Sequence, residues 1–214
     1  MTIRTRLTGS ILLTGAATAL VIGVSVGAAV AVNATWTVKP GGAVTSTAGT
    51  TTLTDTTTHN ALKCTSSKAT ATLKKGSGLS GTAIGSITKL TFSGCTGPLG
   101  IAAVVTPNNL PYKLNATSFS ATSGTTTGSI TGIDTKVVGG PCTVTVDGSG
   151  STPNHTGKVK VTYTNSTHKL KVVASGGNLH LFNATGCSPF FASGDAATFV
   201  GTYTVSPAQT ITSP

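Results

Sequence analysis

The chain has 214 residues and a formal net charge of +10, and it contains no Glu, only four Asp, 44 Thr and 27 Gly. Threonine is β-branched and favours strands, and the strong helix formers are scarce, so this composition excludes a helical protein and predicts an all-β one. So few carboxylates also argue against acid–base catalysis by paired acids, and we expect no enzyme.

The first 34 residues have the pattern of a secretory signal peptide. Arg4 and Arg6 form a basic start, an uncharged run covers 7–32, and small residues gather at its end. This order predicts a helix that is removed after export by cleavage near Ala31 or Ala34. An uncleaved anchor is the alternative, because the apolar run is long enough to span a bilayer.

Residues 35–214 are predicted to form a single all-β domain. In 158–164 the apolar residues alternate strictly with Lys and Thr, so Val159, Val161 and Tyr163 are expected to point inward. Ten or more segments alternate in this way between turns rich in Gly, Asn and Pro, which is typical of an antiparallel β-sandwich. A closed barrel, such as a membrane barrel with a wet lumen, is the alternative.

The segments between and within these strands carry further expectations. The Thr-rich stretch 45–58 is expected to be exposed, and Gly76–Gly81 matches the dinucleotide pattern G-x-G-x-x-G but is interpreted as a flexible loop, since no acid follows at the required distance. The alternation from Cys142 to Val146 places Asp147 on the wet face of its strand. A short likeness around the second cysteine of each half, 35–124 and 125–214, raises the alternative of two divergent half-repeats.

Four cysteines in an exported chain predict two disulfides and no metal site. The pairing Cys64 with Cys95 and Cys142 with Cys187 is favoured over the other two connectivities, because each pair lies within one half of the chain. Zinc is disfavoured because no two cysteines have the short spacing of a zinc knuckle.

A lysine-rich hairpin is the strongest candidate for binding. Lys158 and Lys160 share one face of its first strand and Lys169 and Lys171 share one face of its second. If the two faces coincide, the four ammonium groups predict an anion-binding patch. The alternative is that lysines guard an edge strand against pairing with other chains.

Catalytic candidates are few. The four aspartates occur in turn-like contexts and are expected to cap turns, while His59, His155 and His168 are expected in polar loops. His180 lies in a strand and is expected to be a packed, partly buried histidine rather than a base or a ligand. We therefore expect no catalytic, cofactor-binding or metal-binding residue.

Several motifs of the mature chain resemble a family of uncharacterised secreted proteins of actinobacteria, of a Streptomyces-like type. They are Trp36–Gly42, Thr50–Asp55, Leu62–Cys64, Thr91–Gly100 and Gly201–Pro207. The resemblance implies an exported protein of a Gram-positive bacterium and brings no activity or functional residues with it.

Together these features predict a secreted, non-catalytic extracellular or cell-envelope protein. Without the signal segment it carries twelve Lys against four Asp, which favours a structural or adhesive role or the binding of anionic cell-wall polymers or glycans. Nucleic acid is a poorer partner because no arginine remains in the mature chain, and the membrane is involved only through the uncleaved signal segment. The alternative is a secreted hydrolase or enzyme inhibitor.

Overall fold

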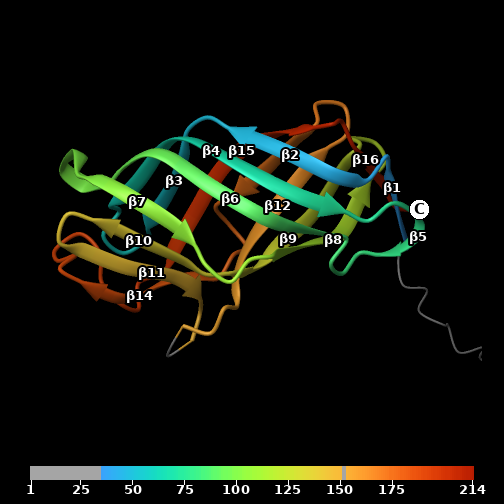
Figure 1. The fold of residues 1–214 in the computed structure, drawn as a ribbon. Helices are drawn as coiled ribbons and strands as arrows, with labels where there is room; N and C mark the ends of the chain where they lie inside the picture. The colour runs from blue at the N-terminus through green and yellow to red at the C-terminus, as the bar shows by residue number, and fades with distance from the viewer. Residues whose placement is uncertain (1–34, 151–152) are drawn as a thin grey trace, which may run out of the picture. The chain divides into compact units, whose positions relative to one another are not determined.

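The alternating, Thr-rich segments form strands throughout the computed structural model, which describes residues 35–150 and 153–214 (Figure 1). This part of the chain contains sixteen strands and one short 3-10 turn, η1 (Pro98–Gly100), so the all-β prediction is confirmed. The predicted signal peptide, 1–34, lies outside the described residues. Within them, no helix has the length and apolar character needed to cross a membrane.

Eight of the strands form a closed antiparallel barrel, in the order β4-β6-β8-β9-β12-β13-β15-β2 and back to β4. Their bounds are β2 (Gly42–Ala48), β4 (Ala61–Leu73), β6 (Gly85–Thr96), β8 (Tyr112–Ser120), β9 (Thr125–Ile133), β12 (Gly157–Thr164), β13 (Lys169–Val173) and β15 (Ala197–Ser206). β3 (Thr51–Asp55) continues β2 between the same two neighbours, β4 and β15. The halves 35–124 and 125–214 contribute four strands each to this one barrel.

The predicted sandwich is therefore wrong. Alternation specifies one apolar face for each strand, but it does not specify whether that face meets a second sheet or the far side of the same sheet. Here β4 pairs with β6 as well as with β2, and this pairing closes the ring. Val159, Val161 and Tyr163 are buried inside the barrel as predicted, while the lysines of β12 are exposed outside it, so the lumen is apolar.

Two smaller groups of strands extend the barrel. The first is a continuation of the main sheet through β7 (Ala102–Pro107), β10 (Thr135–Gly139), β11 (Cys142–Gly148) and β14 (Leu179–Thr185). It begins where β7 pairs with the last residues of β6. The second is a separate sheet of β16 (Thr210–Thr212), β1 (Thr35–Lys39) and β5 (Gly76–Ser80). β1 buries Trp36 and Val38, and β16 buries Ile211.

The glycine-rich segment 76–81 is a strand and not the expected flexible loop. Gly76–Ser80 is β5, which pairs with β1 along an edge. Gly81 ends this segment where the chain passes between Trp36 and the backbone of Ala116: a Cβ atom there would lie 2.3 Å from the Ala116 carbonyl oxygen and 2.6 Å from Trp36 Nε1. The glycines thus serve close backbone packing in a sheet, a role that the dinucleotide pattern does not reveal.

Both disulfides have the favoured connectivity. Cys64 pairs with Cys95 across the adjacent strands β4 and β6, and Cys142 of β11 pairs with Cys187, just after β14. No free cysteine occurs in the part of the chain that the structure describes. Each bridge links strands that are distant in sequence, so both restrict the unfolded chain.

Candidate functional site

The barrel encloses an apolar cavity of about 170 Å³. Its wall is made of the inward side chains of the barrel strands, such as Ala71, Ile130 and Val161. Ile211 of β16 lines it near one end, and Val137 of β10 and Leu179 of β14 line it near the other. The cavity therefore runs through the barrel between the two smaller groups of strands.

One part of the cavity wall reaches the protein surface. β6 pairs with β8 only through 85–87 and with β7 only through 95–96, so its middle part has a strand partner on one side alone. Leu90 and Phe92 lie in this middle part, line the cavity and are only half-buried, as is Val105 of β7. A small molecule therefore has a short route from solvent to the interior.

The four predicted lysines lie on the outer face of β12 and β13. Thr162 lies opposite Lys171, and residues directly opposite each other share a face, so the side chains of both strands point to the same side. All four lysines are exposed: Lys158, Lys160, Lys169 and Lys171.

The register arranges these lysines as a diagonal stripe. Lys160 lies opposite Val173, so its nearest lysine on β13 is Lys171, one diagonal step away at a typical Cα separation of about 7–8 Å. The edge-guarding alternative is wrong, because β12 lies between β9 and β13 and β13 lies between β12 and β15. A surface hollow that includes Lys171, Thr50 and Thr202 adjoins one end of the stripe.

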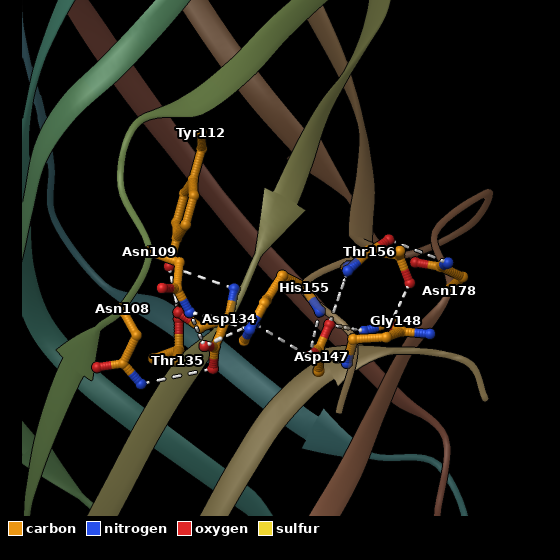
Figure 2. A network of polar contacts seen from close by, with 12 residues as sticks. Asn108, Asn109, Tyr112, Asp134, Thr135, Asp147, Gly148, His155, Thr156 and Asn178 are labelled. Atoms are coloured by element: carbon orange, nitrogen blue, oxygen red, sulfur yellow. Dashed lines mark hydrogen bonds and ion pairs between the residues drawn. The ribbon is translucent and has the colours of Figure 1, made fainter. Parts of the chain in front are cut away.

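A polar cluster lies where the loop between β11 and β12 meets β10 (Figure 2). His155 Nδ1 is 3.0 Å from Asp134 Oδ2 and 3.8 Å from Asp147 Oδ2. Asp134 also accepts a hydrogen bond from Asn109 Nδ2 at 2.6 Å, and its backbone carbonyl accepts one from the Tyr112 hydroxyl. The sequence placed His155 in a loop correctly but gave no sign that two aspartates would meet it there.

Asp147 holds this loop through its backbone. The side chain is fully buried, and its two oxygens accept amide hydrogen bonds from five residues: Gly148, Asn154, His155, Thr156 and Gly157. Burial alone would raise the pKa of Asp147, but the amide hydrogen bonds outweigh it and hold the pKa below its ordinary value. The expected exposed position is therefore wrong, because a strand end that must cap a returning loop turns its carboxylate inward.

Asp134, Asp147 and His155 are close enough to suggest a cation site, since one ligand atom from each lies within 4.8 Å of the others. The hydrogen bonds argue against this use. Both oxygens of Asp147 already accept two or more amides, and Asp134 Oδ2 contacts Asn109 and His155. A cation would have to displace the bonds that fix the loop, so the cluster acts as a structural clamp.

The remaining candidates have structural roles as well. Asp55 caps the turn after β3 by accepting amides from Thr57 and Thr58 at 2.8 and 3.0 Å, in agreement with the predicted turn-capping role. His180 is half-buried, and its Nδ1 lies 3.1 Å from the carbonyl oxygen of Asn178.

Comparison of the chain with protein-family models, with curated proteins and with solved structures finds no match. Inference of function therefore depends on the cavity, the lysine stripe and the polar cluster themselves.

Proposed function

We propose that this protein is a secreted, non-catalytic binding protein that holds a small apolar molecule inside its barrel. The observation that carries the proposal is the apolar cavity of about 170 Å³. Protein interiors are close-packed, and voids larger than a water molecule are few. An engineered apolar cavity of roughly 150 Å³ in another protein stays dry and binds benzene, so this one has the size for a small hydrophobic ligand.

The energy of the empty cavity supports the same conclusion. At roughly 24 cal/mol per Å³, a void of this volume would lower the free energy of unfolding by about 4 kcal/mol. A ligand that fills it restores the lost dispersion contacts, and by mass action it stabilises the folded state. Eight-stranded barrels are also wide enough to hold one small ligand.

Export and the lack of catalysis complete the proposal. Two disulfides are typical of proteins from oxidising compartments, and 1–34 has the sequence pattern of a signal peptide. The meeting of Asp134, Asp147 and His155 would favour the hydrolase alternative, but the amides that fill Asp147 leave it no capacity to act as a base.

Binding of the dye N-phenyl-1-naphthylamine, which fluoresces in apolar surroundings, tests the proposal. The wild-type protein should enhance the dye's fluorescence saturably, and Ala71→Leu, which fills the cavity from β4, should weaken the binding at least tenfold. Ala43→Leu, the same substitution on the exposed face of β2, is the control and should bind as the wild type does. Absence of saturable binding by a folded wild-type protein would contradict the proposal.

A second candidate function is retention on an acidic polymer of the cell envelope through the lysine stripe. It is favoured by the register that gathers Lys158, Lys160, Lys169 and Lys171 on one exposed face. Replacing all four with Gln should abolish retention on purified cell wall at low salt, because screened Coulomb attraction provides the binding. The control replaces four exposed lysines elsewhere and removes the same charge: Lys63, Lys68, Lys89 and Lys113. Equal loss in both variants would show that net charge alone is responsible and would reject the stripe as a site.

A further inference from the structure

We infer that the ligand of the barrel is a slender, uncharged aliphatic molecule with one polar group, such as a hydroxyl, which hydrogen-bonds to Thr51. This inference rests on the proposed function and specifies the class of ligand. Thr51 begins β3, lines the cavity and is only 1% exposed. Its Oγ1 is buried and has no hydrogen-bond partner among the residues that the structure describes.

The other buried polar side chains around the cavity already have partners within the protein. The Tyr163 hydroxyl donates to the carbonyl oxygen of Gln209 at 2.8 Å, and the Tyr203 hydroxyl donates to Ser67 Oγ at 3.0 Å. Tyr112 donates to the carbonyl oxygen of Asp134. Thr51 is therefore the buried side chain of the described wall that still has hydrogen-bonding capacity to offer.

A buried hydroxyl without a partner costs about 1–3 kcal/mol, so its presence in an apolar wall requires a compensating role. A bound water is a poor partner, because buried waters need two to four polar contacts and Thr51 would supply one. A single polar group on an otherwise apolar ligand matches one hydroxyl in an apolar wall.

The charge and shape of the cavity define the rest of the ligand. None of the lining residues is charged, so a carboxylate or ammonium group would be buried without a counter-ion. The lining extends along β4 from Leu62 to Leu73, about 36 Å of strand at a rise of about 3.3 Å per residue. A volume of about 170 Å³ spread along this length is narrow, and it fits a single hydrocarbon chain better than a compact ring system.

The register places Thr51 near one end of the cavity. Thr51 lies opposite Cys64 on β4, and Cys64 lies opposite Cys95 at the end of β6. The other end of the lining is formed by Leu73 of β4 and Ile211 of β16. The polar group of the ligand would therefore lie beside Thr51, with its chain directed toward Ile211.

Displacement of N-phenyl-1-naphthylamine by a matched pair of competitors tests this inference. The pair is 1-nonanol and decane, which have the same number of non-hydrogen atoms, and each is measured against the wild type and Thr51→Val, which removes the hydroxyl and keeps the shape. The variant should weaken 1-nonanol about five- to tenfold, the worth of one hydrogen bond, and leave decane unchanged or tighter. Thr51→Ser, which retains a hydroxyl, should keep most of the affinity for 1-nonanol, and nonanoate should compete poorly with every variant.

The outcomes separate this inference from the proposed function. Equal loss of 1-nonanol and decane affinity, or no loss of either, would overturn the role of Thr51 even though dye binding still supports an apolar carrier. Failure of the dye to bind the wild type would overturn the proposed function and this inference with it. If Thr51→Val does not fold, Thr51→Ala provides the same comparison, and a ratio of 1-nonanol to decane affinity equal to that of the wild type would again reject the role of Thr51.

Discussion

Replacing Asp147 with Asn should destabilise the barrel strongly at neutral pH. The Asp147 carboxylate is fully buried and accepts amide hydrogen bonds on both oxygens, among them those from Asn154 and His155, each at 2.8 Å, to Oδ2. An Asn side chain keeps one acceptor oxygen and turns an NH₂ group toward at least two of these N–H donors. Hydrogen bonds to a charged group contribute about 1.5–3 kcal/mol each, so the loss of two predicts about 4 kcal/mol, allowing for incomplete additivity.

The effect should depend on pH with a definite sign. Because the pKa of Asp147 is lower in the folded state than in the unfolded chain, its ionised form stabilises the fold above the unfolded-state value of about 3.9. This contribution is lost as the pH falls through the folded-state pKa. The stability difference between wild type and Asp147→Asn should therefore be largest near pH 7 and shrink steadily below about pH 4.

Urea unfolding followed by circular dichroism at a series of pH values measures both quantities. Asp55→Asn is the matched control: Asp55 is also buried, but only its Oδ1 accepts amides and its Oδ2 has no partner, so the NH₂ group of Asn can take the unpartnered position. We expect the control to lose less than about 1 kcal/mol. A loss below about 1 kcal/mol for Asp147→Asn at pH 7, or a loss that does not change with pH, would refute the clamp.

Three further results are expected. Replacing Cys142 and Cys187 together with Ser should lower the free energy of unfolding by about 4 kcal/mol, because the bridge spans 45 residues of the unfolded chain, and a loss under about 1 kcal/mol in chemical denaturation would contradict this. Burial, opposed only in part by a hydrogen bond, raises the pKa of Tyr203, so the stability present below about pH 10 should fall as the pH rises through the folded-state pKa; Tyr203→Phe should remove this component in alkaline unfolding curves. His155→Ala should cost less than about 1 kcal/mol despite the 3.0 Å contact with Asp134, since the histidine side chain is 55% exposed, and a larger loss in urea unfolding would mean that the imidazole is an essential part of the clamp.

The sequence predicted well those features that depend on neighbouring residues. The alternation in 158–164 placed Val159, Val161 and Tyr163 correctly in the core, because side chains of a strand alternate between its faces whatever sheet the strand joins. The cysteine pairing was also predicted correctly, since Cys64 with Cys95 and Cys142 with Cys187 lie within separate halves of the chain. Turn capping by Asp55 followed from its local context in the same way.

Tertiary structure alone decided how the strands close and what they enclose. The β4–β6 pairing makes a barrel instead of a sandwich, and the cavity exists only because inward side chains from distant strands leave a gap between them. The meeting of Asp134, Asp147 and His155, and the burial of Thr51 inside a stretch expected to be exposed, arise from the same closure. Local alternation specifies a face for each residue, whereas enclosure depends on contacts between residues far apart in the chain, and no single segment of the sequence encodes these contacts.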